Sequence, residues 1–277
     1  MSQVNTIFSL LQRRQAAIMG IINTTPDSFS DGGLYNTAET ALKHALRLVG
    51  EGADILDVGG ESTRPGADKV SLQQELDRVI PVVERIHNTI AAPISIDTHK
   101  PKVMREALRA GATMVNDVNA LRTEGAIEVV AQHNVPVCIM HMAGQPKTMQ
   151  QKTSYSDVIG QVVEFLMSRI DACLEAGIDL NNLVVDPGIG FGKKLEHNLQ
   201  LLQNTAVIAE QTGCQVLIGV SRKSMIDGIL SRPVEQRLHA SVALAVQAVL
   251  NGAKIVRVHD VRATYDAIRS VEAVLNA

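Results

Sequence analysis

The sequence has no tryptophan and only three tyrosines and four phenylalanines among its 277 residues. So few aromatic rings leave little material for the stacking platforms on which proteins bind single-stranded nucleic acids. The net charge is only −3, and no long stretch carries charges of one sign. We therefore expect neither nucleic acid nor an anionic membrane surface as a partner.

Cysteines and long apolar runs are also scarce. Cys138, Cys173 and Cys214 are far apart and form no CxxC pair, which argues against a disulfide framework or a zinc cluster. No run approaches the roughly 18 apolar residues that a membrane span needs. The N-terminus lacks the basic region and apolar segment of a signal peptide. We expect a protein of the reducing cytoplasm, without a membrane span.

The chain does contain eight short apolar runs, each followed by a predicted helix. The runs are 17–22, 54–58, 93–97, 113–116, 136–141, 182–186, 215–220 and 254–258. They are too short for buried helices and too continuous for strands with one exposed face. The predicted helices are 37–51, 72–90, 101–110, 124–133, 156–176, 194–211, 236–251 and 261–275.

Strands that alternate with helices indicate a parallel sheet. Eight successive units of similar size favour a closed (β/α)8 barrel over the alternative, an open doubly wound sheet. Several predicted helices end at a glycine directly before the next run, where a left-handed conformation can end a helix. These glycines are Gly52, Gly111, Gly177, Gly213 and Gly252.

The chain is expected to form one domain over residues 1–277, since barrels of this class have about 250 residues. No linker or low-complexity segment divides it. Residues 1–16 precede the first unit and are expected to cover the bottom of the barrel. The connections 23–36 and 60–71 are long and rich in Gly, Pro, Ser, Thr and Asp. Such loops are typically mobile and functional.

Polar residues follow the runs at their C-terminal ends, where (β/α)8 barrels build their active sites. Four of them follow different runs and are expected to converge: Asp97, Asn116, Asp186 and Lys223. Carboxylates, an amide and an ammonium complement a flat heterocycle with donor and acceptor edges. Each acid or amide could instead cap the following helix. Capping does not explain Lys223, because an ammonium cannot accept a hydrogen bond.

Arg257 and His259 alternate on the last run, so their side chains share a face. The pair suits a phosphate or diphosphate, which barrels often bind near the seventh and eighth strands. The alternative is an ion pair of Arg257 with Asp260 or Asp266. Asn23, after the first run, is a neutral oxygen ligand that suits a Mg²⁺ also bound by phosphate oxygens and water.

The segment 186–194, DPGIGFGKK, is rich in glycine but is no nucleotide-binding motif. It lacks the leading glycine at Walker spacing, and Lys194 stands where Ser or Thr is required. The glycines are instead expected to turn the loop sharply, so that Asp186 and Phe191 can approach a ligand.

Two long motifs carry a resemblance to a known family. Segment 23–33, NTTPDSFSDGG, resembles the first signature of the dihydropteroate synthases, and segment 57–66, DVGGESTRPG, resembles the second. The similarity continues in order through 95–100, 116–118, 141–146, 186–193, 221–224 and 257–261. It covers nearly the whole chain. Thr24 and His99 depart from the usual pattern, and neither has an expected role.

The resemblance implies a (β/α)8 barrel, usually a homodimer, acting in folate biosynthesis. The implied reaction joins 6-hydroxymethyl-7,8-dihydropterin diphosphate to p-aminobenzoate, forming 7,8-dihydropteroate and releasing diphosphate. Sulfonamides would compete with p-aminobenzoate. The residues implied at the pterin are Asp97, Asn116, Met140, Asp186, Phe191 and Lys223, with Asp97, Asp186 and Lys223 as catalytic residues. Those implied at the diphosphate are Thr63, Arg257 and His259, with Asn23 at Mg²⁺. Those implied around p-aminobenzoate are Phe29, Thr63, Arg64, Pro65 and Ser221.

Two other hypotheses fit part of this pattern. A methyltetrahydrofolate-dependent methyltransferase shares the pterin-binding set but needs neither the diphosphate residues nor the 23–33 loop. A catalytically silent paralogue would be expected to have lost loop residues or Lys223, and these are present. Asp57 and His141 also stand at strand ends, and they receive no role from the sequence.

Overall fold

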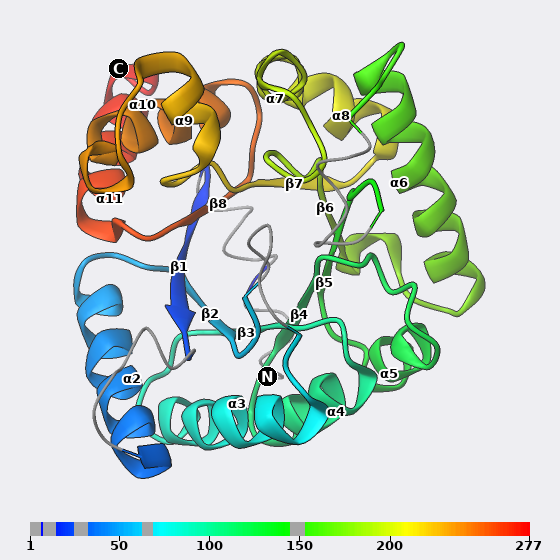
Figure 1. The fold of residues 1–277 in the computed structure, drawn as a ribbon, viewed down its shortest axis with the longest axis vertical. Coiled ribbons are helices and arrows are strands. Elements are labelled where there is room, and N and C mark those ends of the chain that lie inside the picture. The colour runs from blue at the N-terminus through cyan, green and yellow to red at the C-terminus, as the bar shows by residue number, and fades with distance from the viewer. Residues whose placement is uncertain (1–6, 8–14, 25–32, 63–68, 145–152) are drawn as a thin grey trace.

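Eight parallel strands close into a barrel, and helices form a ring around it (Figure 1). The computed structural model describes residue 7 and residues 15–24, 33–62, 69–144 and 153–277. Each strand pairs with the next along the chain, and β8 closes the barrel against β1. The strands are β1 (Ala17–Asn23), β2 (Ile55–Gly59), β3 (Ile94–Asp97), β4 (Met114–Asp117), β5 (Val137–Met140), β6 (Leu183–Asp186), β7 (Gln215–Ile218) and β8 (Ile255–Val258). The predicted (β/α)8 barrel is confirmed, and the open sheet is wrong.

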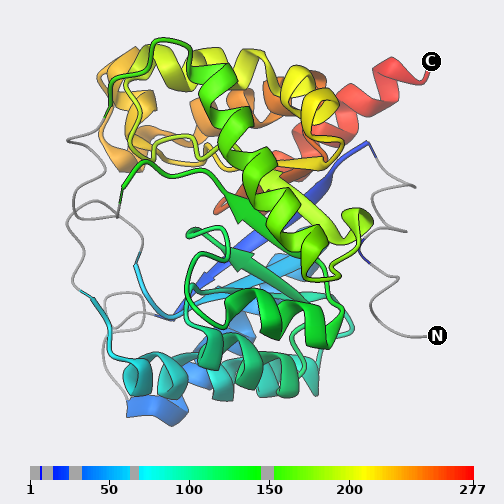
Figure 2. The ribbon, with the colours of Figure 1, turned by 90° about the vertical axis from the view of Figure 1, so that its right-hand side faces the viewer.

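The helices separate the strands as expected, with one helix more than predicted after β6 and another after β7. They are α2 (Gly33–Gly50), α3 (Leu72–His87), α4 (Pro101–Arg109), α5 (Ala126–His133), α6 (Val158–Glu175), α7 (Leu195–Gln203), α8 (Thr205–Thr212), α9 (Ser224–Leu230), α10 (Leu238–Leu250) and α11 (Val261–Leu275). Two short 3₁₀ turns are η3 (Leu180–Asn182) and η4 (Val234–Gln236). Seen from the side, the strands run obliquely between α2–α5 and α7–α11 (Figure 2). None of the described helices is long and apolar enough to cross a bilayer.

The predicted helix 194–211 is two helices in the structure. The backbone of Asn204 leaves helical geometry at φ −102° and ψ 28°. Its side-chain amide donates to the carbonyl of Gln200 at 2.8 Å, and the Thr205 hydroxyl donates to the carbonyl of Leu202 at 2.9 Å. Such local bonds compete with regular helix structure, so the chain bends here and continues as α8.

The interior of the barrel is built in layers from alternate strands, as is usual for this fold. The even-numbered strands supply a fully buried apolar layer, Ile55, Met114, Val184 and Ile255. Two residues further along the same strands stand Asp57, Asn116, Asp186 and Arg257. Because side chains alternate along a strand, these four also point inward. The interior therefore changes from apolar to polar towards the carboxyl ends of the strands.

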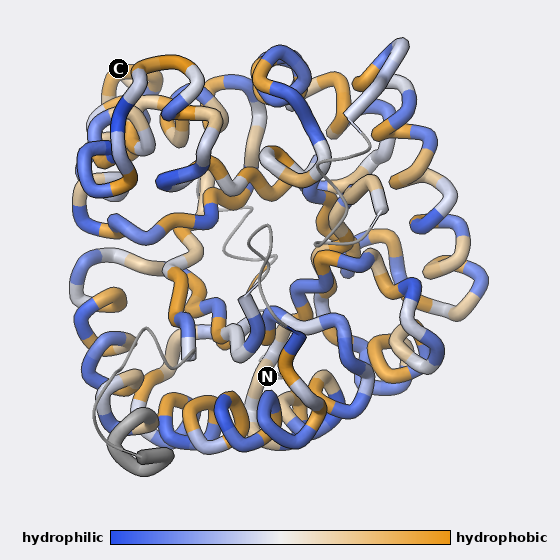
Figure 3. The backbone as a smooth tube through the Cα atoms, viewed as in Figure 1, coloured by the Kyte–Doolittle hydropathy of each residue, from blue (hydrophilic) through white to orange (hydrophobic). Residues whose placement is uncertain are grey.

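Both faces of the strands are buried, which explains the continuous apolar runs. Residues of the other face, such as Leu56 and Val58, pack against the surrounding helices, and Figure 3 shows hydrophobic residues concentrated along the strands. Ile7 packs with Ala17 and Met19 in the interior cluster. The expectation that the N-terminal extension covers the bottom of the barrel is therefore met at Ile7. The rest of residues 1–14 lies outside the described chain.

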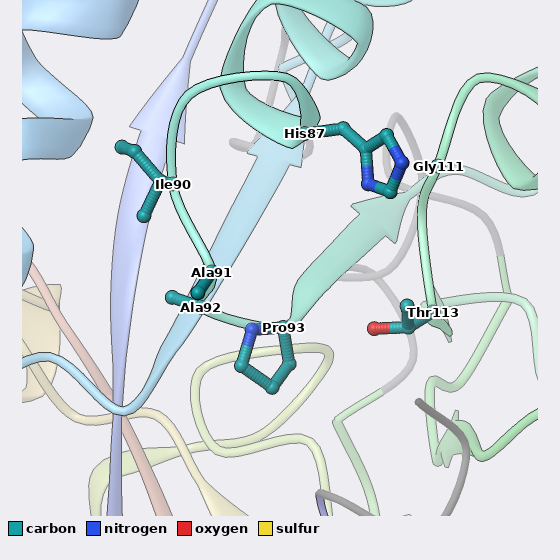
Figure 4. Close-up of a pocket in the computed structure, with 7 residues that line it drawn as sticks. All are labelled: His87, Ile90, Ala91, Ala92, Pro93, Gly111 and Thr113. Atoms are coloured by element: carbon teal, nitrogen blue, oxygen red, sulfur yellow. The ribbon is translucent and has the colours of Figure 1, made fainter. Parts of the chain in front are cut away.

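The five glycines expected at helix ends all have a positive φ, between 67° and 114°. At Gly111 the neighbouring side chain also requires glycine, because an added Cβ would lie 2.2 Å from Cγ of His87. His87 and Gly111 line a small pocket together with Pro93 and Thr113 (Figure 4). This pocket lies before the first residues of β3 and β4, at the end of the barrel opposite the polar strand ends.

Candidate active site

The predicted polar residues converge at the carboxyl end of the barrel, with Arg257 at their centre. Its Nε donates to Oδ2 of Asp57 at 2.6 Å, and its Nη2 donates to Oδ2 of Asp97 at 2.8 Å. The side-chain amide of Asn116 donates to the same Asp57 oxygen at 3.3 Å. Asp57, Asp97, Asn116 and Asp186 are all buried. Side chains from β2, β3, β4 and β8 thus form one connected network.

Burial governs the charges in this network. It raises the pKa of Asp97 to about 7, and Arg257 opposes the shift. Burial also raises the pKa of Asp186, against the opposing effects of Lys223 and of the hydrogen bond from the Gly188 N–H. Burial lowers the pKa of Lys223 to about 8, while Asp186 favours its charged form. Shifts of this kind, in groups gathered at one site, are typical of ligand-binding and catalytic centres.

Arg257 forms the kind of ion pair considered from the sequence, but with other partners. Neither Asp260 nor Asp266 pairs with it; Asp57 and Asp97 do. Asp260 instead accepts a hydrogen bond from Nε of Arg222 at 2.9 Å. The alternative named the wrong partners because it considered only acidic residues close to Arg257 in the chain, whereas the closed barrel brings Arg257 into contact with Asp57 of β2 and Asp97 of β3.

His259 and Ser221, expected at the diphosphate and at p-aminobenzoate, lie in direct contact. His259 Nδ1 is 3.0 Å from Oγ of Ser221, and the backbone N–H of His259 donates to the same oxygen at 3.2 Å. This contact joins the chain after β7 to the chain after β8. The two expected binding regions therefore meet at this point of the barrel mouth.

The glycine-rich loop after β6 turns as predicted. Gly188, Gly190 and Gly192 have φ values of 70°, 85° and 63°. A Cβ at Gly188 would lie 1.9 Å from the carbonyl oxygen of His141, so only glycine fits. The turn lets the Gly188 N–H donate to Oδ1 of Asp186 at 2.7 Å, which orients this carboxylate.

Lys223 lies against the same loop. Its Nζ donates to the carbonyl of Ile189 and lies 4.8 Å from the centre of the Phe191 ring. Phe191 packs in turn on a small apolar cluster that contains Met140 and Met142. Met140 and Phe191, the two apolar residues expected at the pterin, therefore lie together beside Lys223, a polar residue expected there.

Three residues of the site have structural roles that the sequence did not indicate. Asp57 binds Arg257 and Asn116, as described above. Lys193 is buried and its Nζ lies 2.9 Å from Nδ1 of His141. The role of Asp57 could have been predicted, because Asp57 stands in the same layer of the barrel interior as Asn116 and Arg257. Nothing in the local sequence shows that Lys193 turns inward beneath the loop.

Several expected site residues cannot be placed. Phe29, Thr63, Arg64 and Pro65 lie outside the described residues. Asn23 is the last residue of β1 and stands opposite Gly59 in the sheet register. Among the residues that the structure describes, no three acidic, histidine or cysteine side chains could together hold a metal ion.

Comparison with known proteins agrees with this geometry. The sequence model of the pterin binding enzymes matches residues 19–259. The chain is 50% identical to the dihydropteroate synthase of Escherichia coli K12 over 260 residues, which cover 94% of this chain and 92% of the relative. The chain belongs to the dihydropteroate synthase family. This membership favours the synthase interpretation over the methyltransferase alternative.

Solved dihydropteroate synthase structures share the fold over almost the whole chain. The Yersinia pestis dihydropteroate synthase with a sulfonamide drug is 48% identical, has a TM-score of 0.90, and matches over 95% of each chain. The Xanthomonas albilineans dihydropteroate synthase in complex with 7,8-dihydropteroate is 48% identical, has a TM-score of 0.86, and matches over 95% of this chain and 94% of the other. The polar barrel mouth is thus set in the fold of the dihydropteroate synthases.

Proposed function

We propose that this protein catalyses the condensation of 6-hydroxymethyl-7,8-dihydropterin diphosphate with p-aminobenzoate in folate biosynthesis, giving 7,8-dihydropteroate and diphosphate. The observation that carries the proposal is the set of buried Asp97, Asn116 and Asp186 with the partly buried Lys223 around one barrel mouth. It occurs in a chain whose relatives at about half identity are dihydropteroate synthases.

The polar set suits the pterin ring. Asp97 and Asp186 accept N–H bonds from the ring, since a carboxylate matches its amino-pyrimidinone edge. Asn116 and Lys223 provide hydrogen bonds to ring acceptors, and Met140 and Phe191 pack on the ring. Because one Asp97 oxygen already accepts from Arg257, the other oxygen is the one most open to the ligand.

The diphosphate is expected to bind beside Arg257, His259 and Thr63. Arg257 on β8 and His259 directly after it suit an anionic group, because both side chains can donate hydrogen bonds to its oxygens. Asn23 is the expected protein ligand of Mg²⁺, with diphosphate oxygens and water as the remaining ligands, which is how proteins usually hold this ion. When bound, Mg²⁺ would neutralise part of the negative charge on the leaving group.

The charges suggest the course of the reaction. The C–O bond to the diphosphate breaks and its electron pair leaves with the diphosphate, while Arg257 and His259 stabilise the developing anion. Asp97 and Asp186 favour positive charge in the reduced pterin. The arylamine nitrogen then forms the new C–N bond and releases a proton, so no protein nucleophile is needed.

The ammonium of Lys223 would repel a cation that forms on the pterin ring. Asp186 favours its charged form, whereas burial lowers the pKa of Lys223 to about 8. The ammonium is also fixed by the Ile189 carbonyl and the Phe191 ring. We expect these contacts and its bond to the pterin to outweigh the repulsion.

Ser221 and the loop residues Phe29, Thr63, Arg64 and Pro65 are expected around p-aminobenzoate, where sulfonamides compete.

The experiment that tests the proposal mixes purified protein with the pterin diphosphate, p-aminobenzoate and Mg²⁺, and measures both products. Equal amounts of diphosphate and dihydropteroate are expected. Binding of the pterin without product would instead indicate the catalytically silent paralogue. A sulfonamide should raise the apparent KM for p-aminobenzoate without changing kcat.

We also propose that the chain is a single-domain cytoplasmic protein that forms a homodimer. Cys138, Cys173 and Cys214 are free and buried, which fits a reducing compartment. Sedimentation of the purified protein at micromolar concentration should give the mass of two chains, and the mass of one chain would contradict the dimer.

A further inference from the structure

One peptide bond in the loop after β6 is hydrogen-bonded to a side chain on each side. Its carbonyl, that of Ile189, accepts a hydrogen bond from Nζ of Lys223. Its N–H, that of Gly190, donates to Oδ1 of Asn198 at 2.7 Å. A trans peptide bond is planar, so its C=O and N–H point in opposite directions. This single peptide unit therefore connects the amide of Asn198 to the ammonium of Lys223.

Asn198 is well placed to fix the orientation of this peptide. It lies near the start of α7 and is 3% exposed. Its Nδ2 donates to the carbonyl of Lys193 at 3.4 Å, so both polar atoms of its amide bind the loop. On the other side of the peptide, Ile189 is 0% exposed and packs in the hydrophobic core. The peptide is thus held between a core side chain and a buried amide.

The glycine in this peptide lets Lys223 come close. Gly190 has a φ of 85°, and an added Cβ would lie 3.2 Å from Cδ of Lys223. The stem of Lys223 therefore passes directly over the peptide whose carbonyl its ammonium binds. A carbonyl oxygen aimed at an ammonium favours the charged form of a lysine. At Lys223 this acceptor acts against burial, which lowers the pKa to about 8.

We infer that Asn198 is a positioning residue for the pterin site, which holds the Ile189 carbonyl against the ammonium of Lys223. This inference rests on the proposed function, which assigns Lys223 to the pterin ring. Asn198 touches neither substrate in this account. Without its amide oxygen the peptide can rotate, because glycine restricts the backbone little, and the ammonium then loses its fixed acceptor. Loss of Asn198 should therefore weaken pterin binding more than the use of p-aminobenzoate.

Binding and kinetics of Asn198 variants test the inference. In Asn198→Ala the Kd for 6-hydroxymethyl-7,8-dihydropterin, measured by calorimetry, should rise about tenfold, the effect expected from losing one buried hydrogen bond. The apparent KM for p-aminobenzoate at saturating pterin diphosphate should stay within roughly twofold of the wild-type value. Asn198→Asp should restore most of the pterin affinity, because a carboxylate can still accept from the Gly190 N–H. Gln200→Ala is the matched control, since Gln200 is an exposed amide on the same helix, and it should behave as wild type.

A double-mutant cycle separates positioning of Lys223 from a general structural role. If Asn198 acts through Lys223, adding Asn198→Ala to Lys223→Ala should change the pterin Kd little further. A residue that only stabilises the fold would lower the free energy of unfolding without changing the Kd of the folded protein. If Lys223→Ala binds the pterin too weakly for calorimetry, the rescue by Asn198→Asp decides the outcome. If Asn198→Ala does not fold, as judged by circular dichroism, Asn198→Ser takes its place, because its shorter side chain also withdraws the acceptor.

Three results would each overturn the inference. They are an unchanged pterin Kd in Asn198→Ala, no rescue by Asn198→Asp, and the full loss of affinity on adding Asn198→Ala to Lys223→Ala. A wild-type protein that forms no product would refute the proposed function itself. That result is distinct from an active wild type whose pterin affinity does not depend on Asn198.

Discussion

Lys193 gives the most quantitative prediction, because its ammonium is buried beneath the loop that follows β6. The residue is 4% exposed. Its Nζ lies 2.9 Å from Nδ1 of His141, 2.9 Å from the carbonyl oxygen of Gly188 and 3.0 Å from that of Phe191. Methionine has a similar length and volume but cannot donate a hydrogen bond. Replacing Lys193 by methionine therefore removes the titrating group while filling the same space.

The expected effect follows from the pKa of Lys193. Burial lowers this pKa from 10.5 to about 7; nearby Asp186 opposes the shift and Lys223 adds to it. Between pH 7 and 10.5 the folded chain binds fewer protons at Lys193 than the unfolded chain does. The free energy of unfolding therefore rises with pH across this window. For a rise from pH 7 to pH 9, the contribution of this one residue is about 2 kcal/mol.

Urea unfolding of wild type and Lys193→Met at pH 7 and pH 9 measures this contribution. The wild type should gain about 2 kcal/mol more than the variant between the two pH values. Lys223, with a pKa of about 8, titrates in both proteins and largely cancels in the comparison. Lys194→Met is the matched control, because the Lys194 side chain is 55% exposed, and it should keep the wild-type pH dependence. Equal pH dependence in Lys193→Met and wild type would refute the reasoning.

Three further predictions concern the barrel mouth. Asp97→Ala and Lys223→Ala should each lose most activity, because a buried polar edge of the ligand stays unpaired; normal turnover in either variant contradicts the pterin assignment. Deletion of residues 25–33 should impair condensation but leave measurable pterin affinity in calorimetry. Loss of that affinity in a folded variant counts against a separate role for the loop. Gly188→Ala should weaken pterin binding by about tenfold or more, since φ of residue 188 is 70° and the added Cβ would meet the His141 carbonyl. An unchanged Kd for the pterin would contradict this prediction.

The sequence predicted those parts of the fold that local patterns determine. The apolar runs located all eight strands, and the glycines before them marked helix ends whose positive φ the structure confirms. The strand ends also pointed to Asp97, Asn116 and Asp186 as neighbours. Alternation along each strand is sufficient for these predictions, because every inward residue of a barrel faces the same interior.

The remaining features depend on which side chains meet across the barrel. Arg257 and Asp57 are 200 positions apart in the sequence, and only the register of the closed sheet brings them together. The inward turn of Lys193 depends on three glycines at alternate positions, Gly188, Gly190 and Gly192, and on the His141 carbonyl. The break at Asn204 arises from side-chain bonds that replace helix geometry. None of these is visible as a local periodicity.

The most direct test of the account measures product formation by wild type and Asp97→Asn in parallel, with the pterin diphosphate, p-aminobenzoate and Mg²⁺. The account predicts equal amounts of dihydropteroate and diphosphate from the wild type. It also predicts a large loss of turnover in the variant, because an amide has one acceptor oxygen where the carboxylate has two, and carries no charge to stabilise the forming cation. A wild type without product, or a variant as active as wild type, would contradict the claim that this barrel mouth holds and activates the pterin.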